Sequence, residues 1–122
     1  MIILSVLITI NLLLFAAKTW AKQSCENYPT RTCRPAWLPA HFHRIAICET
    51  GINWRFSNSR YVSAFGIYRP AWAEFRPNWV PAVPERATPK QQYAVARAIA
   101  RAVGLSAWSC WTNFSWVRNG SW

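Results

Sequence analysis

The chain has 122 residues and a formal net charge of +10, with 14 Lys and Arg against 4 acidic residues, all of them Glu. This length leaves room for one domain with a small core and excludes a large multidomain protein. The excess of positive charge favours a polyanionic partner: nucleic acid, anionic lipid or bacterial wall polymers.

The N-terminus begins with an almost unbroken apolar run over residues 1–17. This run is shorter than the ~20 residues that cross a bilayer, and the small residues Thr19 and Ala21 suit a signal-peptide cleavage site. No cation precedes the run and two lysines follow it, opposite to the usual charge bias of an exported chain. We expect a signal peptide at residues 1–21, with an uncleaved membrane anchor as the alternative.

An even number of cysteines behind an export signal favours disulfides over free thiols. Counting alone leaves three pairings open. A zinc site built from three of the cysteines with His41 and His43 lacks the short spacings of structural zinc sites, so we expect no metal and no cofactor. The cysteines are Cys25, Cys33, Cys48 and Cys110.

The first elements along the chain are an arm and a helix. Residues 22–39 contain three prolines among polar residues and predict an irregular arm. The stretch 40–50 has no Gly or Pro and ends at Gly51, which predicts a helix with a glycine stop. Apolar residues and one Glu fall at helical spacing in it: Phe42, Ile45, Ala46 and Glu49.

The middle of the chain predicts turns and short elements. Residues 54–68 mix aromatic and polar side chains and indicate turns or a short hairpin bordering a groove. A second, short helix is expected from Pro70 through Trp72 and Phe75, because Pro is favoured in a first turn. The three prolines within residues 76–87 predict a loop.

The clearest predicted helix starts after Thr88, a good N-cap, with Pro89 in the first position and Gln91 in the third, where it completes a capping box. Valine, isoleucine and alanine then repeat at helical spacing up to a glycine stop at Gly104. Two like charges four residues apart on another face should point to solvent or to an anion: Arg97 and Arg101. The aromatic tail, residues 111–122, shows no clear period.

Glu49 is the residue most suited to acid chemistry. It lies in the last turn of the first expected helix, where the helix dipole disfavours a carboxylate. That placement, with partial burial beside Ile45 and Trp54, would raise its pKa, as a general acid requires. From local features alone, the alternative is an ordinary surface Glu paired with Arg44 or Arg55.

Three segments carry a more specific signal: RIAICETGINW at residues 44–54, SAFGIYRPAW at 63–72 and TPKQQYAVARAIARAVGLSAWSC at 88–110. In the same order they resemble the catalytic segment (VAxCESGGNW), the groove segment ending in Ser-Thr-Trp and the closing helix (REQQIAVAERVLAAQGWGAWPVC) of one family. This is the resuscitation-promoting factor and transglycosylase-like family of exported wall enzymes.

The resemblance implies a fold. It is a mainly α (α+β), lysozyme-like domain at residues 40–110, with helices around a glycan-binding groove. It also implies a disulfide between Cys48 and Cys110, which leaves Cys25 and Cys33 as the second pair.

The resemblance also implies a function, the cleavage of peptidoglycan glycan strands with Glu49 as the catalytic residue. Tyr61, Tyr68 and Trp72 are the expected substrate-binding residues. We expect a groove beside Glu49 that is lined by Trp72 and by Tyr61 or Tyr68, with core packing on Phe75 as the alternative for Trp72. Trp54 and Trp108 are expected in the core. We expect a monomer whose partners are peptidoglycan and other anionic wall polymers, and not nucleic acid. Its expected location is secreted, periplasmic or in the cell wall, or membrane-anchored if the N-terminal segment is retained.

Two departures from the family pattern leave open the alternative that this chain is an inactive or differently specific relative. Ile52 replaces a family Gly, and the groove segment lacks the Gln that the family places before its aromatic residue. A mechanism with one acid fits best, as in lytic transglycosylases, because Glu74 is the only plausible second carboxylate. Plain hydrolysis, as by a muramidase, is the alternative reaction. The competing class is a non-catalytic cationic protein that binds walls or membranes.

Overall fold

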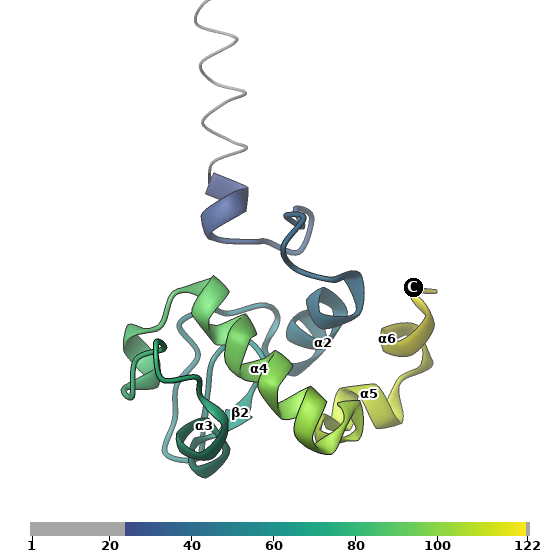
Figure 1. The fold of residues 1–122 in the computed structure, drawn as a ribbon. Helices are drawn as coiled ribbons and strands as arrows, with labels where there is room; N and C mark the ends of the chain where they lie inside the picture. The colour runs from purple at the N-terminus through teal and green to yellow at the C-terminus, as the bar shows by residue number, and fades with distance from the viewer. Residues whose placement is uncertain (1–23, 122) are drawn as a thin grey trace, which may run out of the picture.

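A computed structural model describes residues 24–121 and is mainly helical, with one two-stranded antiparallel sheet, as the sequence predicts (Figure 1). The expected signal peptide lies outside the described residues. No helix within residues 24–121 is both long and apolar enough to cross a bilayer. In chain order the elements are a helical turn at 24–27, α2 (Ala40–Thr50), β1 (Tyr61–Val62), β2 (Ile67–Tyr68), α3 (Arg69–Phe75), the 3-10 turn η1 (Pro84–Arg86), α4 (Pro89–Val103), the 3-10 turn η2 (Leu105–Ala107), α5 (Ser109–Asn113) and α6 (Ser115–Asn119).

Helix α2 has the bounds that its sequence predicts. Its side chains at positions i, i+3 and i+4, Phe42, Ile45 and Ala46, are buried in the core. The helix ends because Gly51 adopts a left-handed conformation, with φ of 68°, and donates its backbone N–H to the Ile47 carbonyl. This stop leaves the last turn of α2 at the edge of the core.

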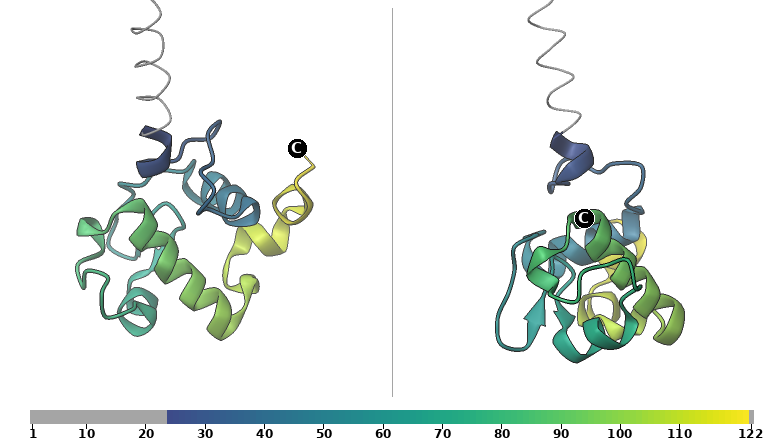
Figure 2. Two further views of the ribbon diagram at one scale, coloured as in Figure 1. Left: turned by 45° about the horizontal axis from the view of Figure 1, so that its top comes forward. Right: turned by 60° about the vertical axis from the view of Figure 1, so that its left-hand side comes forward.

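Helix α4 begins with the predicted capping box. Gln91 donates its backbone N–H to the Thr88 hydroxyl and accepts from the Thr88 N–H with its own side chain. Its inner face carries buried residues at helical spacing. In Figures 1 and 2, α4 runs across the outside of the molecule, with α3 on one side and α2 and the C-terminal helices on the other. The buried residues of α4 are Pro89, Gln92, Val95, Ala96 and Ile99.

Two disulfides connect distant parts of this arrangement. Cys48 of α2 is bonded to Cys110 of α5, and Cys25 is bonded to Cys33 within the N-terminal arm, the pairs that the family resemblance implies. All four sulfur atoms are therefore used, so a zinc site would have no thiolate ligand. Among the described residues no cluster of His, Cys, Asp and Glu is placed to hold a metal ion.

The aromatic tail is more regular than its sequence indicates. Residues of the tail form most of α5 and all of α6, and α6 packs against α2. Val117 is fully buried, and the Arg44 side chain donates from Nε to its carbonyl at 2.8 Å. Helices of five residues are too short to show a periodic pattern, so tertiary contacts decide their conformation.

The backbone at Ile52, just after the end of α2, is strained. Its φ is 57°, in the left-handed region that a β-branched residue rarely adopts. Glycine normally lowers stability relative to alanine, but the left-handed conformation costs an L-residue ~1–2 kcal/mol. We therefore expect Ile52→Gly to be about 1 kcal/mol more stable to urea than Ile52→Ala.

The exposed helix position Ala73 provides the control for this prediction, because Ala73→Gly should show the ordinary order and lose stability. Equal stability of the two Ile52 variants would mean that the backbone at this position is not left-handed in solution.

Candidate active site

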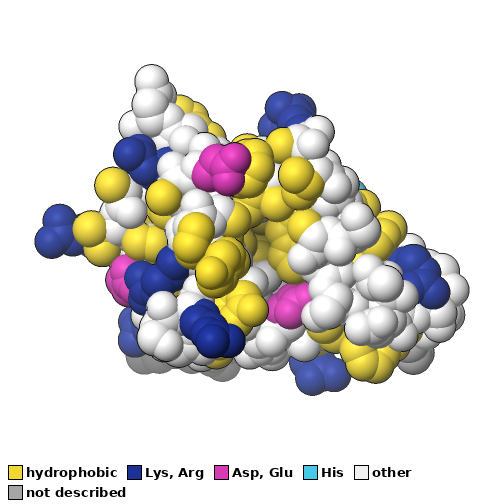
Figure 3. All heavy atoms as spheres, turned by 90° about the horizontal axis from the view of Figure 1, so that it is seen from below, with side chains coloured by type: hydrophobic (Ala, Val, Ile, Leu, Met, Phe, Trp, Pro, Cys, Tyr) yellow, Lys and Arg dark blue, Asp and Glu magenta, His cyan; other side chains and the backbone are white. Residues whose placement is uncertain are grey.

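A groove runs past the end of α2 between the β1–β2 hairpin and the segment that joins α4 to α5. It is formed by two adjoining hollows of about 300 Å³ each, which share residues on both walls. Figure 3 shows that this side of the molecule is hollowed, with many hydrophobic side chains around the hollow and acidic side chains exposed near its border. The lining residues are Glu49, Thr50, Phe56, Tyr61, Gly66, Ile67, Tyr68, Ala71, Ile99, Ala107, Trp108 and Ser109.

Glu49 is the one carboxylate among these lining residues. It is half-buried, and its Oε1 accepts a hydrogen bond from the Cys110 backbone N–H at 3.1 Å. Burial raises the pKa of Glu49, and the hydrogen bonds from Cys110 and from the Ser109 side chain counter only part of that rise. Within residues 24–121 the one ion pair joins Arg69 and Glu85, so Glu49 has no cationic partner there.

The groove wall next to the Glu49 carboxyl group is formed by the backbone of Gly66. A Cβ atom placed on Gly66 would lie 3.5 Å from both Cβ and Oε2 of Glu49, and Gly66 has a φ of 60°. Glycine meets both demands of this position, since it tolerates the left-handed conformation and leaves the space beside the carboxylate open.

Side chains from other elements fix this backbone segment. The Thr50 hydroxyl donates to the Ala64 carbonyl at 2.7 Å, and the Trp108 indole N–H donates to the Phe65 carbonyl at 2.9 Å. The carboxamide of Gln92 accepts from the Ala64 N–H at 3.0 Å. Three contacts from α2, α4 and the α4–α5 junction thus position the groove wall before any ligand binds.

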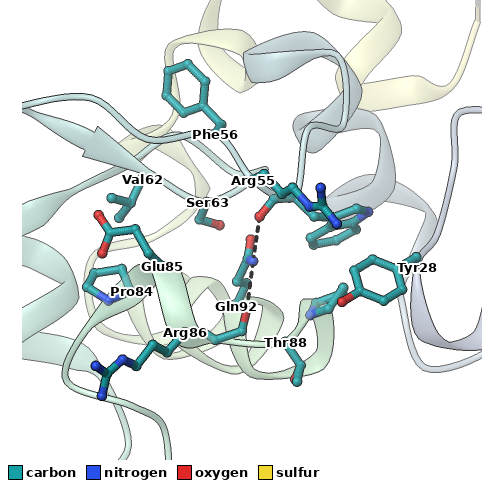
Figure 4. A pocket seen from close by; sticks show the side chains of 13 residues that line it. Tyr28, Arg55, Phe56, Val62, Ser63, Pro84, Glu85, Arg86, Thr88 and Gln92 are labelled. Atoms are coloured by element: carbon teal, nitrogen blue, oxygen red, sulfur yellow. Dashed lines mark hydrogen bonds between the residues drawn. The ribbon is translucent and has the colours of Figure 1, made fainter.

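Gln92 has a wider role, because its side chain also joins two further loops. It is 2% exposed and donates to the carbonyls of Trp54 and Ala87, at 2.9 and 3.1 Å. These contacts are at the base of a separate hollow of about 310 Å³, which Figure 4 shows with Tyr28, Arg55 and Arg86 around it. The hollow shares Phe56 with the groove.

We expect Gln92→Leu to lower the free energy of unfolding by about 2–4 kcal/mol, because one buried and two part-buried backbone groups lose the partner that Gln92 provides. Urea denaturation followed by tryptophan fluorescence measures the loss. Arg97→Leu on the exposed face of the same helix is the matched control and should change stability by less than about 0.5 kcal/mol. A similar effect of both substitutions would rule out the role given to these hydrogen bonds.

The predicted aromatic residues separate into two groups. Tyr61 and Tyr68 line the groove, are 42% and 52% exposed, and face each other with ring centroids 5.8 Å apart. The prediction that Trp72 lines the groove is wrong: Trp72 is 1% exposed in the core and donates its indole N–H to the Pro81 carbonyl. Its position on the inner side of α3 explains this, because that side packs against α4.

Other groove residues were not predicted from the sequence. Trp108 is buried, as expected, yet it also forms part of the groove wall. Gly66, Ala107 and Ser109 are in turns or at helix ends, where no periodic pattern marks them. The family segments that contain them were the available signal. Glu74 is exposed on α3 and does not belong to the groove lining.

Comparison with known proteins gives one result. The family model described as the transglycosylase-like domain matches residues 35–111. This range holds α2, the hairpin, α3, α4 and the groove between them. No curated protein sequence and no solved structure matches the chain.

Proposed function

Because the chain belongs to the transglycosylase-like domain family, whose role is the cleavage of peptidoglycan-type glycans, we propose that it cuts the glycan strands of bacterial peptidoglycan with Glu49 as its catalytic acid. The observation that carries the proposal is the half-buried Glu49 carboxyl group, with a raised pKa, in an open groove. A raised pKa keeps a larger share of the group protonated near neutrality, which is the form that a general acid uses.

In the proposed mechanism one carboxyl group serves both steps. Protonated Glu49 donates its proton to the glycosidic oxygen as the bond to the muramic acid C1 breaks. The resulting carboxylate then removes the proton from the hydroxyl on C6 of the same sugar, whose oxygen bonds to C1. The product is a 1,6-anhydro sugar, and Glu49 returns to its protonated form.

The groove supports a one-acid mechanism because it offers no second carboxylate. Hydrolysis by two carboxylates needs both groups beside the scissile bond. Glu74 is exposed on α3, and Glu85 is held by Arg69 and the Ser57 hydroxyl. In the proposed complex Tyr61 and Tyr68 stack on sugar rings along the hairpin side, because exposed aromatic faces bind the apolar faces of sugars.

The disulfides and the proposed substrate also indicate where the protein acts. The two disulfides fit an extracellular or wall-acting protein, since such bonds persist in oxidising compartments. We propose that the protein is secreted or reaches the cell wall, that it acts as a monomer, and that other anionic wall polymers are secondary partners.

Product analysis tests the reaction. The purified protein is incubated with isolated peptidoglycan, and the soluble fragments are identified by mass spectrometry. A transglycosylase gives anhydro ends, which are lighter by one water than the reducing ends that hydrolysis gives. If only reducing ends are found, the reaction is hydrolysis and the proposed transglycosylase mechanism is wrong. Binding without any fragments would identify the protein as a non-catalytic wall binder.

A further inference from the structure

A second concave surface lies on the outer side of α4, away from Glu49. It has a volume of about 410 Å³ and combines aromatic rings with cations. We call it the outer groove and define it by six of its lining residues: Trp37, Trp79, Lys90, Tyr93, Arg97 and Arg101.

Helix geometry separates the outer groove from the candidate active site. Ile99 lines the active-site groove, and Arg97 and Arg101 each lie two residues from it along α4. Two residues correspond to about 200° around a helix, so both arginines are on the opposite side. A polymer can therefore occupy the outer groove without entering the groove beside Glu49.

The cations of the outer groove form a row without acidic partners. Lys90, Arg97 and Arg101 lie on one face of α4 and span about 16 Å along its axis. None of them takes part in the single ion pair of the described chain, and Arg97 and Arg101 are exposed. The surface is thus complementary to a ligand that carries several negative charges.

The turn that carries Trp79 in the outer groove is held by hydrogen bonds. Trp79 is 63% exposed, but the turn that carries it is fixed on both sides. The adjacent Val80 is 1% exposed and donates its N–H to the Pro77 carbonyl, and its own carbonyl accepts from the Arg76 side chain at 3.0 Å. An exposed indole on a fixed turn is arranged for stacking on a flat apolar face of a ligand.

The other wall is joined to the core. The Tyr93 ring packs against Trp37 and against the buried Phe42, with centroid distances of 6.0 and 5.2 Å. Lys90 lies over the Trp37 ring, with Nζ 5.9 Å from its centroid. Aromatic rings thus occupy fixed places in a hollow, not on a protruding surface of the kind that inserts into a membrane.

We propose that the outer groove binds a second stretch of peptidoglycan strand, with Trp79 stacked on a sugar ring and Arg97 and Arg101 paired with free carboxylates of the peptide substituents. The choice of polymer rests on the proposed function, but binding here requires no cleavage. Peptidoglycan offers both sugar rings and carboxylates, whereas a polyol-phosphate chain offers no ring of its own for the indole. The site would hold the protein on the wall while Glu49 acts on another segment.

Sedimentation with insoluble peptidoglycan, stripped of phosphate-containing polymers, tests the proposal. Binding is measured in a Glu49→Gln background, so that cleavage does not alter the polymer. We expect Arg97→Gln/Arg101→Gln and Trp79→Ala each to raise the dissociation constant about tenfold. Trp79→Phe should restore most of the binding, because it retains an aromatic face.

A second pair of exposed arginines provides the matched control. Arg31→Gln/Arg60→Gln removes the same charge outside the outer groove and should change the constant by less than about threefold. Equal losses of binding in the two double variants would show diffuse charge attraction in place of a defined site, and would overturn the proposal. Unchanged binding in the Arg97/Arg101 double variant would also overturn it.

Two further measurements identify other occupants. If the outer-groove variants lose binding only to phosphatidylglycerol vesicles, or only to walls that retain phosphate polymers, the occupant is not peptidoglycan and the proposal is wrong. With Glu49 intact, the same variants should cleave short soluble glycan fragments at the parental rate and whole peptidoglycan more slowly. Failure of binding and failure of Glu49 catalysis are therefore read from separate assays.

Discussion

Glu49→Gln is expected to lower the rate of peptidoglycan cleavage by about 10²- to 10⁴-fold, the contribution typical of general acid–base catalysis. Glutamine keeps the shape of the side chain and can still accept the hydrogen bond from the Cys110 N–H. It cannot donate and recover a proton in the two steps of the reaction. The release of soluble fragments per unit time measures the loss, and the circular dichroism spectrum should remain that of the parent.

Glu74→Gln is the matched control, since it makes the same chemical change on exposed α3, outside the groove lining. It should change the rate by less than about threefold. Comparable losses in both variants would show that two carboxylates cooperate, which favours hydrolysis. Full activity of Glu49→Gln would remove this residue from the mechanism.

Removing the disulfide between α2 and α5 should have the largest effect on stability. Cys48 and Cys110 are 62 residues apart in sequence, and closing a loop of that length is worth about 4 kcal/mol in the chain-entropy model. We expect Cys48→Ala/Cys110→Ala to lose about that free energy of unfolding in urea. It should also lose activity, because the disulfide holds α5 against α2, and the backbone N–H of residue 110 donates to Glu49 only while the two helices stay together.

The arm disulfide provides the comparison. Cys25 and Cys33 are separated by 8 residues, so Cys25→Ala/Cys33→Ala should cost only about 2.5 kcal/mol. Neither cysteine lines the groove, so this variant should leave the cleavage rate of the folded fraction unchanged. An equal or larger loss from the arm pair would contradict the loop-length explanation.

Local signals were enough to predict the two principal helices. In α4, Thr88, Pro89 and Gln91 form a capping box that involves only neighbouring residues, and the buried face follows a simple helical period. In α2 the stop at Gly51 is equally local. Such features involve residues that are close together in sequence, so the sequence alone is enough to predict them.

The groove could be predicted only in part, because its walls come from distant segments. Glu49 and the two tyrosines were predicted to border it, and they do. Trp72 was misplaced, since sequence does not show which side of the short α3 faces α4. The hydrogen bonds of Gln92 and Trp108 to the wall join residues 28 and 43 positions apart, a relation that no local pattern contains.

The half-buried carboxyl group of Glu49 also links proton binding to folding. Its pKa is higher in the fold than in the unfolded chain, because burial disfavours the charged form. Between these two pKa values the native protein holds a proton that the unfolded chain has released, so the stability from this group is greatest in acid and declines as the pH rises through the folded pKa. At neutral pH the ionised fraction of Glu49 opposes the native state. The residue proposed for catalysis is thus one whose environment favours chemistry over stability.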